Sequence, residues 1–118
     1  PNLFPPDFKP ELKIIGPTNV YGESEFYLDP HLLPEPVDRD YTWEILPTNY
    51  PAMVYRYVGS STSIKVKLVY DSTIRINMKY TIIATNRSGG LNMEDKLYVE
   101  VERGCKLVPI YPTSQWDY

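Results

Sequence analysis

Alternating apolar and polar positions recur along most of the chain, with the period of β-strands that bury one face. The clearest run is SSTSIKVKLVY at residues 60–70, where aliphatic side chains alternate with Lys65 and Lys67. YTWEIL at residues 41–46 follows the same period. Both segments are therefore predicted to be half-buried strands.

The rest of the alternating pattern falls into short segments separated by turn residues such as proline, glycine, asparagine and aspartate. The further strands are predicted at residues 11–15, 19–21, 25–29, 52–59, 73–86 and 96–102. About seven short strands with regular turn signals are typical of sandwiches with Greek-key connections. We therefore predict an all-β, immunoglobulin-like sandwich of two sheets.

The two ends differ from the alternating middle, which divides the chain into residues 1–10 as an N-terminal arm, 11–103 as the sandwich and 104–118 as a C-terminal arm. Both arms are rich in proline and poor in the charge that marks solvated tails. We expect them to be extended and to contact a partner, unless they fold back on their own sandwich. The aromatic candidates for partner contact are Phe4, Phe8, Tyr111, Trp116 and Tyr118.

Trp43 could be either a core residue or an exposed platform for a ligand. Tyr41 and Ile45 share its side of the strand, so the three side chains form one apolar stripe. Such a stripe favours burial, because an aromatic side chain there removes a large apolar area from water. We predict that Trp43, Tyr80 and Ile82 anchor the core.

Composition and charge argue against some classes of function and of structure. A net charge of −3, with lysine and arginine scattered, argues against a nucleic-acid partner, which usually meets a basic patch. No apolar run approaches the ~18 residues that a membrane span requires. Twelve prolines argue against long helices and eleven tyrosines favour strands.

The sequence offers little for catalysis. His31 is the single histidine and Cys105 the single cysteine, so no internal disulfide forms and a Cys–His pair would have to meet across the fold. Neither residue lies in a recognisable motif. We predict that His31 is an exposed loop residue and that the protein is not an enzyme.

Acidic side chains raise the question of calcium, which prefers several converging oxygens. Glu35, Asp38 and Asp40 lie together before the strand at residues 41–46, and Glu23 and Glu25 fall in a predicted turn. No D-x-D-x-D-G loop is present. We predict no cofactor, with calcium as the alternative to solvated carboxylates.

Tyr55 and Tyr57 share one side of their predicted strand, and Tyr50 precedes them. An exposed pair of this kind would suit a sugar ring, so a carbohydrate-binding accessory domain is the alternative function. The other interpretation is that the pair lies on the core face of an edge strand, with Arg56 outward.

Four stretches together are similar to the PKD-like and bacterial immunoglobulin-like domains, over residues 11–102. They are IIGPTNVYGES near the start, YTW at residues 41–43, YTIIATNRSGG at residues 80–90 and LYVEV at residues 97–101. In that superfamily an aromatic and an A-x-N-x-x-G turn recur, matched here by Tyr80 and by Ala84 to Gly89. The resemblance also implies that Trp43 occupies the place of the core tryptophan.

The resemblance implies a non-catalytic module of a secreted or surface protein of Gram-negative bacteria or of their phages, outside the cell or on a virion. Its partners would be other chains of an assembly or neighbouring domains. Within this class, the resemblance favours a surface protein, whereas the lack of a signal-peptide pattern after Pro1 favours a virion decoration or connector protein.

Overall fold

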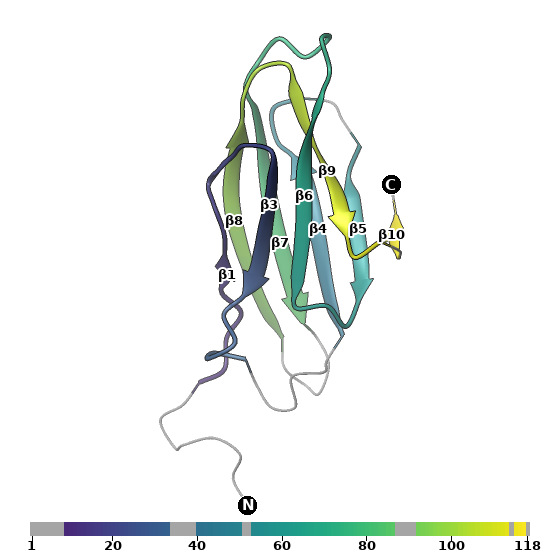
Figure 1. Cartoon of the computed structure of the whole chain (residues 1–118). Helices are drawn as coiled ribbons and strands as arrows, with labels where there is room; N and C mark the ends of the chain where they lie inside the picture. The colour runs from purple at the N-terminus through teal and green to yellow at the C-terminus, as the bar shows by residue number, and fades with distance from the viewer. Residues whose placement is uncertain (1–8, 34–39, 51–52, 87–91, 114, 118) are drawn as a thin grey trace, which may run out of the picture.

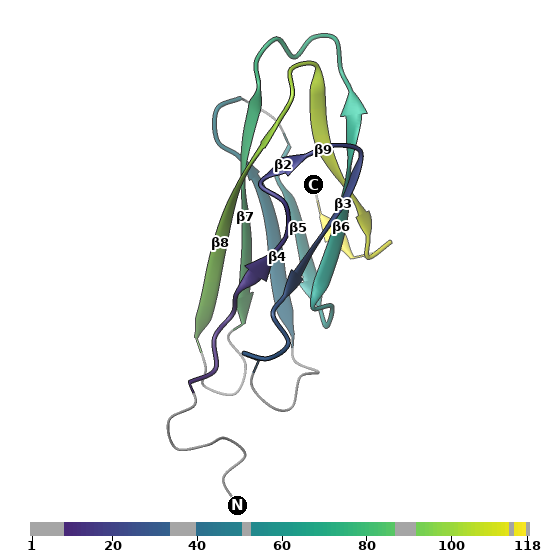
Figure 2. The ribbon, with the colours of Figure 1, turned by 60° about the vertical axis from the view of Figure 1, so that its left-hand side comes forward.

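The computed structural model describes residues 9–33, 40–50, 53–86, 92–113 and 115–117, and these residues form ten β-strands and no helix. The strands form two sheets that face each other (Figures 1 and 2), which confirms the predicted all-β sandwich at that level. The strands are β1 (Ile14–Ile15), β2 (Asn19–Val20), β3 (Glu23–Leu28), β4 (Tyr41–Pro47), β5 (Tyr55–Gly59), β6 (Ser63–Tyr70), β7 (Met78–Asn86), β8 (Met93–Val101), β9 (Cys105–Tyr111) and β10 (Trp116–Asp117).

The four-stranded sheet has the order β1-β3-β6-β9, and the six-stranded sheet has the order β10-β5-β4-β7-β8-β2. Neighbouring strands are antiparallel except β2 and β8, which are parallel. The N-terminal segment therefore serves both sheets, with β1 beside β3 and β2 beside β8. Gly16 lies at the crossing against the ring of Phe26, and a Cβ there would overlap with ring atoms. Glycine is needed at this point because the backbone passes so close to a core side chain.

The core lies between the sheets and is filled by the inward positions of the alternating segments. Tyr41, Trp43 and Ile45 on β4 are fully buried. The indole Nε1 of Trp43 donates a hydrogen bond to the carbonyl of Ser61 at 3.0 Å, so its polar atom keeps a partner. Tyr80 and Ile82 on β7 lie in the same core. Burying side chains of this size stabilises the fold by roughly 1.5–3 kcal/mol each.

The strand predicted at residues 73–86 begins later, at Met78. The reason is a turn at Asp71, whose carboxylate accepts hydrogen bonds from the N–H and the hydroxyl of Thr73. Aspartate commonly stabilises turns in this way. Ile74 is still buried against the core, but Ile76 lies outside the strand and is 40% exposed.

The C-terminal segment is part of the sandwich, so the predicted boundary at residue 104 is wrong. β9 pairs with β6 along the edge of the four-stranded sheet, and β10 pairs with β5 at the edge of the other. Leu107 on β9 is 1% exposed and belongs to the core. Pro109 is the reason why β9 was not predicted from the sequence, because proline disrupts strands everywhere except at edges and bulges. The N-terminal arm lies mostly outside the described residues.

The long edges of both sheets are partly blocked. On the free edge of β9, the N–H of Leu107 donates to the hydroxyl of Tyr80 at 3.2 Å, and Pro109 has no N–H to offer. At β8, the short strand β2 covers one end, and the carboxylate of Asp95 accepts the N–H of Ile14 from β1 at 2.8 Å. Features of this kind discourage the addition of a strand from another chain.

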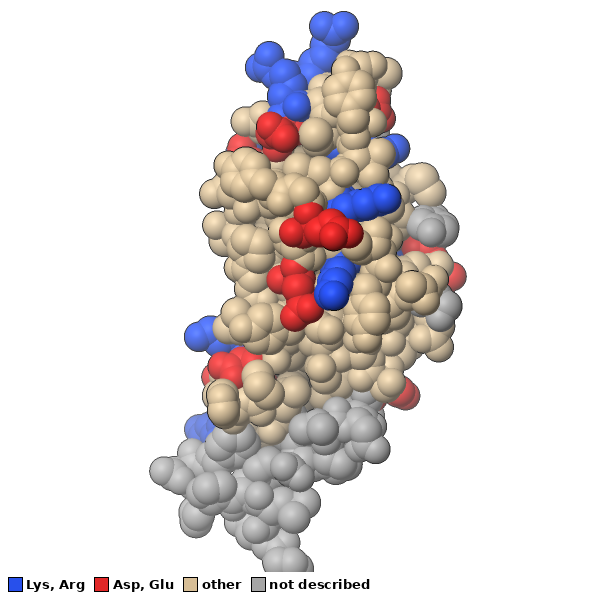
Figure 3. Space-filling model, viewed as in Figure 1, with Lys and Arg blue, Asp and Glu red and all other residues tan. Residues whose placement is uncertain are grey.

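The outward face of the four-stranded sheet carries a small ladder of opposite charges. Glu23 lies opposite Lys67 and Glu25 opposite Lys65 across β3 and β6. Figure 3 shows acidic and basic side chains gathered in the middle of this face, with mostly uncharged surface around them. Glu23 and Glu25 therefore belong to a strand, and the turn predicted for them is wrong.

Candidate binding cleft

A cleft of about 260 Å³ opens where the two sheets part, between the side of β5 and the side of β9. We call it the corner cleft. Its wall comes from segments far apart in the sequence, namely the β4–β5 connection, β5, the loop after β6, β7 and β9. The lining residues are Tyr50, Met53, Tyr55, Asp71, Ile74, Tyr80, Lys106 and Leu107.

The floor of the corner cleft is made of core residues. Tyr55, Ile74, Tyr80 and Leu107 are each no more than 8% exposed. At the mouth, by contrast, Met53 is 56% exposed. The cleft thus leads from an exposed flexible side chain down to an apolar and aromatic floor, and methionine adapts easily to a bound surface.

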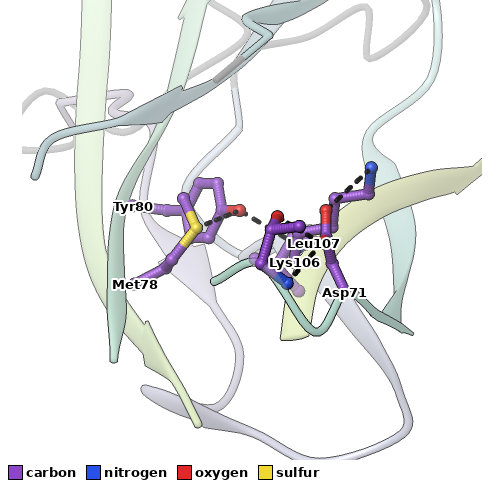
Figure 4. A network of polar contacts seen from close by, with 6 residues as sticks. Asp71, Met78, Tyr80, Lys106 and Leu107 are labelled. Atoms are coloured by element: carbon purple, nitrogen blue, oxygen red, sulfur yellow. Dashed lines mark hydrogen bonds and ion pairs between the residues drawn. The ribbon is translucent and has the colours of Figure 1, made fainter. Parts of the chain in front are cut away.

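The hydroxyl of Tyr80 joins the two sheets at this floor. It accepts the N–H of Leu107 and donates to the Sδ of Met78 at 3.7 Å, as Figure 4 shows. β7 carries Tyr80 and β9 carries Leu107, so this contact crosses from the six-stranded to the four-stranded sheet. Burial raises the pKa of Tyr80 above its ordinary value, because the charged phenolate would lose its hydration.

The polar side of the cleft is an ion pair between Asp71 and Lys106, with 3.8 Å between carboxylate oxygen and Nζ (Figure 4). The loop that holds Asp71 is fixed, since the N–H of Asp71 donates to the carbonyl of Gly104 at 2.7 Å. The hydrogen bonds from Thr73 lower the pKa of Asp71, and the charge of Lys106 lowers it further. The carboxylate is therefore ionised at neutral pH.

In chemical terms the cleft offers an apolar floor, three tyrosine rings and one charged pair at its side. This combination suits non-covalent binding of an apolar or aromatic group that carries a polar end. Pockets that bind ligands commonly combine an apolar lining with a few fixed polar groups.

Tyr55 and Tyr57 do not form the exposed ligand face predicted from the sequence. They are 8% and 3% exposed, because they stand opposite Ile45 and Trp43 in β4 and point into the core with them. Arg56, between them, points outward. The phenol oxygen of Tyr57 accepts the N–H of Ser61 at 3.1 Å. The interpretation as the core face of a strand is correct.

The C-terminal aromatics that were predicted to contact a partner are only partly available. Trp116 is half-buried, its ring lies 5.5 Å from that of Tyr57, and its Nε1 donates to the carbonyl of Pro112 at 2.8 Å. Tyr111 is 44% exposed, with the Nζ of Lys65 5.9 Å from its ring centre. Phe4, Phe8 and Tyr118 lie outside the described residues.

His31 and Cys105 lie far apart. His31 follows β3 and Cys105 begins β9, and both strands run antiparallel to β6, so the two residues are at opposite ends of the sandwich (Figure 1). His31 is exposed, and its N–H donates to the carboxylate of Asp29. Burial raises the pKa of the Cys105 thiol, and the nearby carboxylate of Glu102 raises it further. The geometry excludes a Cys–His pair.

Among the described residues, no three or more histidine, cysteine, aspartate or glutamate side chains lie together as a metal would require. Asp40 is exposed, and Glu35 and Asp38 lie outside the described part of the chain. Asn86 is 1% exposed at the end of β7.

The corner cleft itself was not predicted. No sequence signal marks it, because its walls come together only through the pairing of the strands. Within the described ranges, no helix is long and apolar enough to cross a membrane. No protein-family model, curated protein or solved structure matched the chain.

Proposed function

We propose that the chain is a non-catalytic interaction module of immunoglobulin-like topology, which holds an apolar or aromatic side chain of a protein partner in the corner cleft. The topology is supported by the order of the strands. The N-terminal segment contributes β1 to one sheet and β2 to the other, β4 carries the buried Trp43, and β4, β7 and β8 are successive neighbours in the six-stranded sheet. In this proposal β4, β7 and β8 correspond to the strands C, F and G of an immunoglobulin-like sandwich.

The observation that carries the proposal is the contrast between the mouth and the floor of the cleft. Met53 is exposed at the mouth, whereas the floor consists of side chains that are almost fully buried. A partner side chain that enters such a pocket loses its contact with water, and anchors in desolvated pockets dominate the energetics of interfaces.

The sheet edges support contact through side chains rather than through an added strand. The hydroxyl of Tyr80 accepts the N–H of Leu107, and the carboxylate of Asp95 accepts the N–H of Ile14. Pro109 has no N–H to donate from the edge of β9. A partner strand would find few free backbone groups at these places. Membership in a virion or a bacterial surface assembly remains part of this proposal and rests on the resemblance of the sequence.

The test uses peptides selected from a random phage-displayed library on the wild-type chain. We expect the selected peptides to share a large apolar residue and to bind Met53→Ser at least about fivefold more weakly, since Met53 packs over the bound side chain and an interface residue that matters contributes more than about 1 kcal/mol. Val58→Ser is the matched control, because Val58 is 50% exposed and does not line the cleft.

Affinities are measured by fluorescence polarisation, and the bound residues are mapped by NMR. The proposal predicts amide shifts at Lys106 and Leu107 and unchanged affinity for Val58→Ser. It is contradicted if no peptide is selected, if Met53→Ser binds as well as the wild type, or if both variants lose affinity equally.

A further inference from the structure

A second hollow lies on the outward face of the six-stranded sheet, over β2, β8 and β7. These three strands are neighbours in the order β7-β8-β2 at one edge of the sheet (Figure 2). It consists of two adjoining hollows of about 330 and 240 Å³, which share Asn19 and Glu100. We call them together the outer groove. The groove differs from the corner cleft, which opens between the two sheets.

An exposed tyrosine stands at each end of the outer groove. Tyr98 on β8 lines the larger hollow and is 68% exposed, and Tyr21, just after β2, lines the smaller one and is 72% exposed. The parallel register sets Asn19 beside Glu100, so the two tyrosines lie four residues apart along the strands. At about 3.3 Å per residue, this is roughly 13 Å between the two rings' attachment points along the sheet.

Hydrogen-bonding side chains fill the space between the tyrosines. Asn19, Glu100 and Lys79 are direct neighbours in one row across β2, β8 and β7. Thr18 and Thr48 border the larger hollow, and Asn77 and Glu102 border the smaller one. The row therefore offers an amide, a carboxylate and an ammonium group, which together donate and accept hydrogen bonds.

The floor of the groove is held by hydrogen bonds of its own. The N–H and the hydroxyl of Thr48 both donate to the carbonyl of Lys79, at 2.9 and 3.0 Å. The side-chain amide of Asn49 donates to the carbonyl of Asn77 and accepts the N–H of Lys79, at 3.0 and 2.9 Å. In this way Asn49 extends the pairing of β4 with β7 beyond Pro47. A fixed floor lowers the entropy that binding would cost.

We propose that the outer groove binds a short oligosaccharide, with Tyr98 and Tyr21 stacking against sugar rings and the row of Asn19, Glu100 and Lys79 bonding to hydroxyl groups. Sugar rings present an apolar face and a rim of hydroxyls, and an exposed tyrosine beside mixed donors and acceptors is complementary to both.

The charge of the groove argues against other ligands. Glu100 and Glu102 outnumber the single cation of the lining, Lys79, so a phosphorylated or nucleic-acid ligand would meet net repulsion. An apolar peptide would leave the row of Asn19, Glu100 and Lys79 without hydrogen-bond partners. A polar, largely uncharged ligand with an apolar face fits this row and also the apolar part of the lining, which includes Val99 and Tyr80.

The test compares the wild-type chain with the double variant Tyr21→Ala/Tyr98→Ala on an array of immobilised neutral and acidic oligosaccharides. The best-bound oligosaccharide is then titrated by calorimetry. We expect the double variant to lose affinity at least about tenfold, because both rings that stack against the sugar are removed together. Tyr70→Ala is the matched control, since Tyr70 is 78% exposed and borders neither hollow.

Thermal unfolding checks that the double variant stays folded, and Asn19→Ala tests the polar row separately. The proposal stands if Asn19→Ala also weakens binding and Tyr70→Ala does not. It is overturned if no oligosaccharide distinguishes the wild type from the double variant, or if Tyr70→Ala loses as much affinity. It is equally overturned if the groove binds only peptides, or if the NMR shifts caused by the oligosaccharide fall at the corner cleft.

Discussion

Replacing Tyr80 by phenylalanine removes one oxygen atom that joins the two sheets. The ring stays in place, so the packing of the core hardly changes. The N–H of Leu107, however, loses the acceptor that lies at 3.2 Å in the wild type. A buried donor without a partner costs about 1–3 kcal/mol, and we expect the lower part of this range, about 1–2 kcal/mol, because the corner cleft lets water approach.

This loss of unfolding free energy can be converted into a shift of the melting temperature, Tm. Unfolding entropies of about 2.1 cal/mol/K per residue give about 0.25 kcal/mol/K for the 118-residue chain. A loss of about 1–2 kcal/mol therefore lowers Tm by about 4–8 °C. Calorimetry measures the shift, and hydrogen exchange of the Leu107 amide reports the broken contact directly.

Tyr70→Phe is the control, because the side chain of Tyr70 is 78% exposed. Its stability should stay within about 0.5 kcal/mol of the wild type. If Tyr80→Phe melts at the wild-type temperature while the Leu107 amide remains protected, the hydroxyl of Tyr80 does not hold the sheets together.

Two further predictions concern the same region. Burial raises the pKa of Tyr80, so the phenol ionises first in the unfolded chain, and stability that is complete below about pH 10 is lost as pH rises through the folded-state pKa. Urea midpoints across this range should fall less steeply for Tyr80→Phe, and equal slopes would contradict the assignment. Deleting residues 105–118 removes β9 and β10 and uncovers the core beside β6, so we expect cooperative unfolding to disappear from calorimetry. A truncated chain with the wild-type Tm would show that this segment is an arm after all.

Where the sequence alternates cleanly, it predicts the structure well. β4 and β6 have one buried and one outward face, so their pattern reports the fold directly. β9 was not predicted from the sequence, for a physical reason. Pro109 interrupts it, and a register shift at Lys65 and Val66 breaks its alternation against β6. An edge strand with one buried residue in seven leaves a weak periodic signal.

The burial of Tyr55 and Tyr57 illustrates a different limit of prediction from an alternating pattern. Their alternation with Arg56 fixes which residues share a face, but not which face is buried. That choice depends on the partner strand, because Tyr57 stands opposite Trp43 and therefore points the same way. The predicted burial of Trp43 would have shown that Tyr57 is also buried only if the pairing of β4 with β5 had been known.

The corner cleft and the outer groove depend on the same short stretch of β7. Lys79 borders only the groove, whereas Tyr80, its neighbour, borders both the groove and the cleft. Asn49 holds this stretch in register by bonding on both sides of Met78, to Asn77 and Lys79. A change at Asn49 should therefore disturb both surfaces, whereas changes at Met53 or Tyr98 should affect only one. Because a strand presents successive side chains to opposite faces, one fixed register can serve two binding surfaces.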